Sequence, residues 1–134
     1  MKKRVFFGTD ANVGAFLAAF GRDVVASFAA DEIGREKIEY ALSEILNNSV
    51  EHGHRGDPRK MVTVRWSLTN GSLVVIVADE GGGFLPVIPV EPPPASVPRG
   101  RGLWSISADG TKLGFNVKGN EVTLVFEGRK EHES

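Results

Sequence analysis

The chain lacks cysteine, and it has no long apolar run. Without cysteine, disulfides, catalysis by a thiolate and zinc sites built on cysteine are excluded. Apolar runs such as Leu73 to Ala78 are far shorter than the roughly 18–20 residues that a membrane-crossing helix needs. The opening Met-Lys-Lys-Arg is followed by only three apolar residues, which is too few for a secretory signal. We therefore expect a soluble cytoplasmic protein without membrane contact.

An excess of charge of either sign is also missing. The chain has 16 basic and 17 acidic residues and a formal net charge of −1, which gives no electrostatic reason to expect a nucleic-acid partner. Histidine is scarce, and the spacing of His52, His54 and His132 matches no zinc template. The chain does have 41% hydrophobic residues in a length of 134, enough to bury one core. We therefore expect residues 1–134 to form a single domain.

Hydrophobic periodicity predicts the order of the secondary-structure elements. Apolar residues at three- and four-residue intervals predict one helix from Thr9 or Asp10 to about Phe28 and another from Asp31 to about His52. Alternating or continuous apolar runs predict strands, and Asn70-Gly71 is a hairpin signal. The predicted strands cover residues 4–8, 61–68, 73–78, 111–117 and 121–126, and a short third helix covers 103–108. This order predicts an α+β two-layer sandwich, in which three helices cover one face of a mostly antiparallel mixed sheet.

The first segment with candidate chemistry is Glu44 to His52, near the end of the second predicted helix. Glu44 and Asn48 are four residues apart, so a helix places one above the other. A carboxylate can accept a proton, and a neutral amide oxygen can coordinate a hard cation such as Mg²⁺. A solvent-exposed helix face explains the same residues, although the adjacent Asn47 and Asn48 are unfavourable within a helix.

The second segment is Asp79 to Phe84, directly after the apolar strand at 73–78. Its three glycines allow the backbone to approach a flat ligand without interference from Cβ atoms. A carboxylate at the end of a strand can accept a hydrogen bond from an exocyclic amine, such as the one adenine carries. A flexible turn is the alternative interpretation.

The third segment is Arg99 to Leu103, at the start of the third helix. Glycines before a helix expose backbone N–H groups, and together with the helix dipole and two arginines they suit phosphate binding. The segment is neither a Walker A loop nor a dinucleotide fingerprint. A loop that carries arginine for another reason remains the alternative.

The order of the three segments is more informative than any one of them. A helix suited to Mg²⁺, a strand end suited to adenine, a long proline-rich loop and a phosphate-binding helix start describe a complete nucleotide site. The chain resembles the GHKL (Bergerat-fold) ATPases, and within them the RsbW-type anti-sigma factor serine kinases, from about residue 5 to residue 126. Glu44 to His52 matches the N-box, Asp79 to Phe84 the first glycine box and Gly100 to Leu103 the second. Gly119 to Val122 resembles the family's last hairpin.

The resemblance implies a kinase mechanism that uses ATP and Mg²⁺. It implies that Asp79 binds the adenine amino group, that Asn48 coordinates Mg²⁺, and that Glu44 is the general base toward a serine or threonine hydroxyl. The implied substrate is a STAS-type anti-sigma factor antagonist, which in such circuits displaces a sigma factor or another target from the kinase; homodimers are common in the family. The other implied nucleotide contacts are Gly81, Gly83, Arg99, Gly100, Arg101, Gly102 and Leu103.

The chain departs from the family pattern at two places. Asn120 stands where many members have a threonine that supports the adenine-binding aspartate. The loop from Leu85 to Arg99, which we expect to be a lid, is short and rich in proline. Two other interpretations remain: a binding switch that uses ATP to shape a surface without phosphorylating a partner, and a structural domain without nucleotide.

Overall fold

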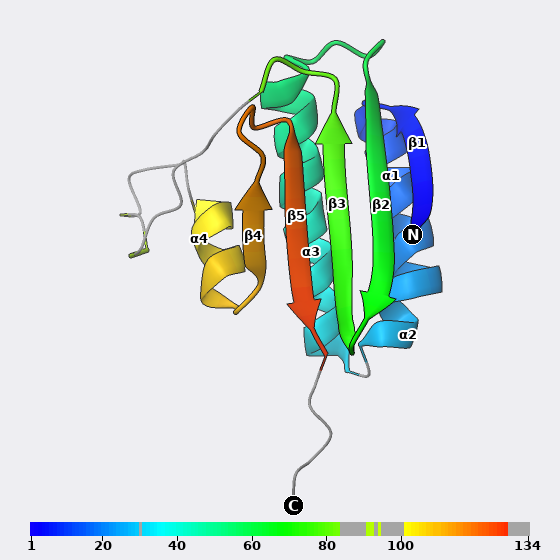
Figure 1. Ribbon diagram of the computed structural model, residues 1–134, viewed down its shortest axis with the longest axis vertical. Coiled ribbons are helices and arrows are strands. Elements are labelled where there is room, and N and C mark those ends of the chain that lie inside the picture. The colour runs from blue at the N-terminus through cyan, green and yellow to red at the C-terminus, as the bar shows by residue number, and fades with distance from the viewer. Residues whose placement is uncertain (30, 84–90, 93, 95–100, 129–134) are drawn as a thin grey trace, which may run out of the picture.

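The protein forms one sheet with its helices gathered on one side, as the ribbon of the computed structural model shows (Figure 1). The structure describes residues 1–29, 31–83, 91–92, 94 and 101–128. The strands are β1 (Lys2–Phe7), β2 (Met61–Thr69), β3 (Ser72–Asp79), β4 (Lys112–Phe115) and β5 (Glu121–Glu127). The helices are α1 (Asp10–Phe20), α2 (Ala26–Phe28), α3 (Glu32–Asn48) and α4 (Arg101–Ala108), with π-helical turns η1 (Gly21–Val25) and η2 (Ser49–Gly53).

The five strands lie in the order β1-β2-β3-β5-β4, and each of the four neighbouring pairs is antiparallel. β1 and β2 are antiparallel because two continuous helical segments lie between them in the chain, one from α1 to α2 and one from α3 to η2, and each runs along the sheet once. β2 and β3 form the hairpin predicted at Asn70-Gly71, where both residues have positive φ, 51° and 78°. The predicted α+β sandwich is confirmed, with a sheet whose described pairs are all antiparallel.

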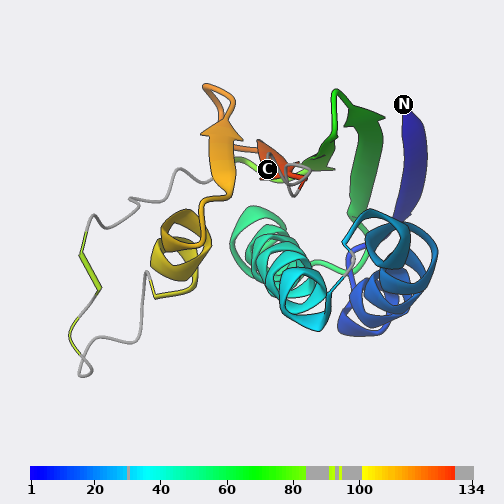
Figure 2. The ribbon, with the colours of Figure 1, turned by 90° about the horizontal axis from the view of Figure 1, so that it is seen from below.

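The helices cover a single face of this sheet (Figure 2). Thr9 caps α1 by accepting a hydrogen bond from the Asn12 backbone N–H at 3.1 Å, and the helical path continues through η1 and α2 to Phe28. Asp31 caps α3 in the same way, with the N–H of Gly34 at 2.7 Å. Both caps agree with the predicted helix starts.

The core lies between the helices and the sheet, and α3 is its centre. One side of α3 is buried against alternate residues of β2, β3 and β5. This burial leaves Glu44 and Asn48 half-buried at the margin of the core. The helix contributes Ile38, Ala41, Leu42, Ile45 and Leu46, and the central strand β3 contributes Leu73, Val75 and Val77. Among the described residues, no helix has both the length and the apolar character to cross a membrane.

Candidate functional site

Helix α3 carries the first two candidate residues, and both are accessible from its polar margin. Glu44 and Asn48 are one turn apart and half-buried. The neighbouring Asn47 has a local explanation, since its amide donates to the Ser43 hydroxyl at 3.4 Å. Within the described part of the chain, the Asn48 amide makes no hydrogen bond, so its oxygen is free to coordinate a ligand.

The π-helical turn η2, which continues α3, brings the end of this helix against Asp79. The wider turn is closed by the bond from the His54 N–H to the Ser49 carbonyl at 2.8 Å. A Cβ atom on Gly53 would lie only 2.7–2.8 Å from the carboxylate atoms of Asp79. Gly53 therefore lets the Asp79 carboxylate lie against the helix backbone. Any larger residue at position 53 would leave too little room for this carboxylate.

The Asp79 carboxylate is oriented by the turn that follows β3. One of its oxygens accepts the Gly81 backbone N–H at 2.8 Å. The backbone of Asp79 is held by Asn120, whose carbonyl accepts the Asp79 N–H at 2.9 Å and whose amide donates to the Asp79 carbonyl at 3.4 Å. Asn120 thus supports the main chain of Asp79, whereas no described bond joins it to the carboxylate.

Two of the three glycines after Asp79 are required by close backbone packing. A Cβ atom on Gly81 would overlap the carbonyl oxygen of Gly53. Gly83 has φ +101°, and a Cβ atom there would overlap the carbonyl oxygen of Lys118. Gly82 has open space around it. The segment is therefore a tightly packed turn at Gly81 and Gly83.

His54 is a site residue that sequence reasoning missed. Its side chain is buried, and its Nε2 accepts the Glu80 backbone N–H at 2.9 Å, directly after Asp79. The other ring nitrogen, Nδ1, has no hydrogen-bond partner within the described part of the chain and lies against Gly8. No local pattern in the sequence distinguishes this histidine from an exposed loop residue, because its partner is 26 residues away.

The start of α4 meets α3 at Glu44. A Cβ atom on Gly102 would overlap the Glu44 carboxylate, so the first turn of α4 packs on this side chain through bare backbone. Leu103, the next residue, is buried in the core. Arg101 begins α4, and its side chain lies outside the described residues, as do Arg99, Gly100 and all of the predicted lid from Leu85 to Arg99 except residues 91, 92 and 94.

The seam between α3 and α4 is polar and negatively charged. Tyr40 lies one turn before Glu44 on α3. Burial raises the pKa of the Tyr40 phenol, the negative charges of Glu44 and Asp109 raise this pKa further, and a hydrogen bond with Ser105 opposes the shift. Glu44 of α3, Ser105 of α4 and Asp109, just after α4, therefore all lie near the Tyr40 phenol.

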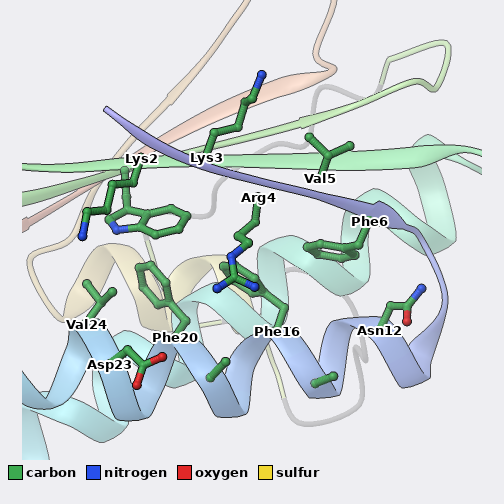
Figure 3. A pocket seen from close by; sticks show the side chains of 13 residues that line it. Lys2, Lys3, Arg4, Val5, Phe6, Asn12, Phe16, Phe20, Asp23 and Val24 are labelled. Carbon is green, nitrogen blue, oxygen red and sulfur yellow. The ribbon is translucent and has the colours of Figure 1, made fainter.

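Two surface hollows lie elsewhere. The first, of about 580 Å³, lies between β1 and α1 (Figure 3), and the second, of about 840 Å³, lies near Phe28 and Phe126. Neither is lined by Glu44, Asn48 or Asp79. The three predicted segments meet instead at Gly53, Gly81 and Gly102. These residues have no side chain, so the backbone there can pack closely against the neighbouring segment.

The antiparallel sheet covered by helices on one face, with the three motifs at one end of it, is typical of one family of ATP-binding domains. The chain belongs to the family of the histidine kinase-like ATPase domain, which matches residues 8–126, and the family name implies an ATP site. It is similar to the serine-protein kinases RsbW of Bacillus subtilis (strain 168) and Bacillus licheniformis, at 39% and 35% identity over 57 residues. Each match covers 42% of this chain and 34% of the relative, so the chain spans about a third of the length of these curated relatives.

A solved structure has the same fold. The histidine kinase domain of the blue-light activated histidine kinase from Erythrobacter litoralis EL346 matches 85% of this chain and 60% of its own, with a TM-score of 0.53 and 19% identity. The resemblance predicted from the three motifs is confirmed by the family match and the RsbW relatives.

Proposed function

We propose that the chain is an ATP-dependent serine/threonine kinase of the anti-sigma factor type. In this proposal it phosphorylates a STAS-type anti-sigma factor antagonist and sequesters a sigma factor or another regulated target in the cytoplasm, where it can form a homodimer. The observation that carries the proposal is the pair of bare-backbone contacts on α3 and η2: Gly102 against Glu44, and Gly53 against Asp79. The similarity to serine-protein kinases RsbW supports the choice of phosphate acceptor.

The spacing of the two contacts suits a nucleoside triphosphate. Glu44 and Gly53 are nine residues apart, which at the α-helical rise of 1.5 Å per residue is at most about 13.5 Å along the helical path. This length matches an extended triphosphate with its base at Asp79 and its terminal phosphate near Glu44. Asn48 lies between the two ends, where the phosphate chain would pass.

At the base end, Asp79 is the proposed adenine contact. One oxygen of its carboxylate is committed to the Gly81 N–H, and the side chain is half-buried, so the remaining acceptor sites face a restricted volume. They suit the amino group of adenine and repel the carbonyl that guanine carries in its place. Gly81 and Gly83 keep the backbone around this contact free of side chains.

Asn48 is the proposed protein ligand of Mg²⁺, and the residues present fit this ion. The Asn48 amide is unbonded within the described chain, and among the described residues no group of three or more histidine or acidic side chains is placed to hold a metal ion. Such a sparse donor set suits Mg²⁺, which keeps several waters and takes further ligands from phosphates. When bound, the ion would neutralise phosphate charge.

The first turn of α4 is the proposed phosphate contact. Its N–H groups and helix dipole favour anions, and Arg99, Gly100, Arg101 and Gly102 supply the rest of the contact in this proposal, with Leu103 fixing the helix in the core. Glu44 lies against this same turn. In this proposal, a partner hydroxyl that approaches the terminal phosphate comes within reach of Glu44. Its carboxylate would take the proton of that hydroxyl.

The test is phosphoryl transfer by the full chain with Glu44→Gln, which keeps the size of the side chain and removes its basicity. We expect Mg-ATP affinity to stay within a few-fold, whereas transfer to a purified STAS antagonist falls by roughly 10²-fold or more. Glu36→Gln is the matched control, because Glu36 is an exposed residue of the same helix. Radiolabelled ATP and phosphosite mapping measure the transfer.

Two outcomes would reject the proposal. Transfer at the wild-type rate by Glu44→Gln would remove Glu44 from the mechanism. ATP-dependent binding of STAS partners by the wild type, without transfer to any of them, would establish the binding switch in place of the kinase.

A further inference from the structure

Strand β1 is an open edge of the sheet. In the part of the chain that the structure describes, β1 pairs with β2 on one side and with no strand on the other. Every second residue of such a strand directs its N–H and C=O groups outward, so the edge is a template for an additional strand. Val5 and Phe7 are 45% and 51% exposed along it, which leaves apolar surface uncovered at the same place.

A groove lies under this edge, between β1 and α1. Its volume is about 580 Å³, and its inner wall is aromatic. Phe16 stacks on Phe6 and on Phe20 with ring centroids 5.3 and 5.2 Å apart, and Phe20 meets the edge of Trp66 at 5.1 Å. An additional strand beside β1 would direct every second side chain into this groove.

The groove is also cationic. Figure 3 shows Lys2 and Arg4 directed toward α1, whereas Lys3 points to the opposite side of the sheet. None of these three cations forms an ion pair with a described residue. Asp23 is the one acidic residue among the described residues that line the groove, and it already pairs with Arg22 at 3.5 Å. Lys2 and Arg4 against Asp23 leave a charge of +1 within the groove, and Lys3 adds a third positive charge on the other side of the same edge strand.

Charge and apolar character are separated along β1: Lys2, Lys3 and Arg4 come first, and Val5, Phe6 and Phe7 follow. We propose that the β1 edge and its groove bind an extended segment of a partner protein as a sixth, antiparallel strand, with apolar residues followed by acidic residues. In that direction, the acidic half of the segment lies beside the three cations and the apolar half beside Val5, Phe6 and Phe7.

A second copy of the chain is a poorer occupant. Antiparallel pairing of two β1 strands places the cationic half of each beside the apolar half of the other. Lys2, Lys3 and Arg4 then find no carboxylate on the neighbouring strand. An acidic partner segment satisfies these charges and the backbone edge together.

The probe is a fluorescein-labelled peptide with blocked ends, Val-Phe-Val-Glu-Asp-Glu, titrated with the full chain at low salt. The control peptides are Glu-Asp-Glu-Val-Phe-Val, which reverses the order, Val-Phe-Val-Lys-Arg-Lys, which reverses the charge, and Ser-Ser-Ser-Glu-Asp-Glu, which lacks apolar residues. We expect anisotropy to report the tightest binding for the probe. Lys2→Glu combined with Arg4→Glu should weaken it at least about tenfold, and the exposed-site control Lys37→Glu by less than about twofold.

Hydrogen exchange distinguishes strand addition from simple charge attraction. The probe should protect alternate β1 amides from exchange. If circular dichroism shows that the charge-reversed double variant is unfolded, the double variant Lys2→Gln and Arg4→Gln is used in its place. The proposal is overturned if any control peptide binds as tightly as the probe. It is also overturned if anionic vesicles or oligonucleotides compete regardless of apolar content, or if sedimentation shows a dimer that protects β1 without peptide. ATP binding is measured in parallel, so a failure here is separate from a failure of the proposed kinase.

Discussion

His54 links the turn after β3, which carries the proposed adenine contact Asp79, to the rest of the fold, and His54→Ala is the sharpest test of that link. The imidazole is 2% exposed, and its Nε2 accepts the Glu80 N–H at 2.9 Å. It also fills the space beside Gly8, where a Cβ atom would approach Nδ1 to 2.8 Å. Removing the ring therefore leaves the Glu80 N–H without its acceptor and opens a cavity between η2 and the turn after β1.

The expected loss follows from these two effects. An unsatisfied backbone N–H costs about 1–2 kcal/mol at this partly buried position, and the cavity adds about 1–2 kcal/mol. The free energy of unfolding should therefore fall by about 2–4 kcal/mol, which corresponds to a decrease in Tm on the order of 10 °C. ATP affinity should also fall, because Asp79 immediately precedes Glu80 and is less firmly held once the bond from Glu80 to His54 is lost.

Urea unfolding and calorimetric ATP titration measure the two effects. His54→Gln is the matched variant, since its amide oxygen can accept the Glu80 N–H and its volume fills part of the site. It should recover about half of the lost stability and most of the ATP affinity. A His54→Ala protein as stable as wild type, or a glutamine variant no better than alanine, would refute the proposed link.

Three further predictions concern the site and its surroundings. Asn48→Ala should abolish the Mg²⁺ dependence of ATP binding in calorimetry, and an unchanged dependence would reject this ligand. Gly53→Ala should displace the Asp79 carboxylate and weaken ATP by about 1–3 kcal/mol while the far-ultraviolet circular dichroism stays unchanged; equal affinity would show that the carboxylate needs no such contact. Hydrogen bonds from the side chain and backbone of Arg59 lower the pKa of the Asp57 carboxyl to about 2. The ionised Asp57 therefore contributes to stability above pH 3.8, and this contribution is lost as the pH falls toward 2. Arg59→Ala removes the side-chain hydrogen bonds and keeps the backbone one, so it should raise the NMR titration midpoint of Asp57 part of the way toward 3.8, and a midpoint that stays near 2 would exclude the Arg59 side chain as a cause.

The elements with local causes were predictable from the sequence. Thr9 and Asp31 cap helices through bonds to residues three positions ahead, and Asn70-Gly71 turns the β2–β3 hairpin through its own positive φ angles. The periodicity of α3 indicates its buried side, and the structure places Glu44 and Asn48 half-buried beside it. Each of these features depends on a few neighbouring residues, so a short stretch of sequence contains its cause.

The tertiary structure alone decided how distant segments meet. β5 lies between β3 and β4, and the contacts of Gly53 with Asp79 and of Gly102 with Glu44 join residues 26 and 58 positions apart. The role of His54 depends on the same kind of contact. Such contacts follow from how the whole core is packed, since the energy that selects them is the burial of residues from every element at once. The sequence by itself determined the elements, the three motifs and their order, whereas packing decided which backbone atoms touch the two carboxylates of the site.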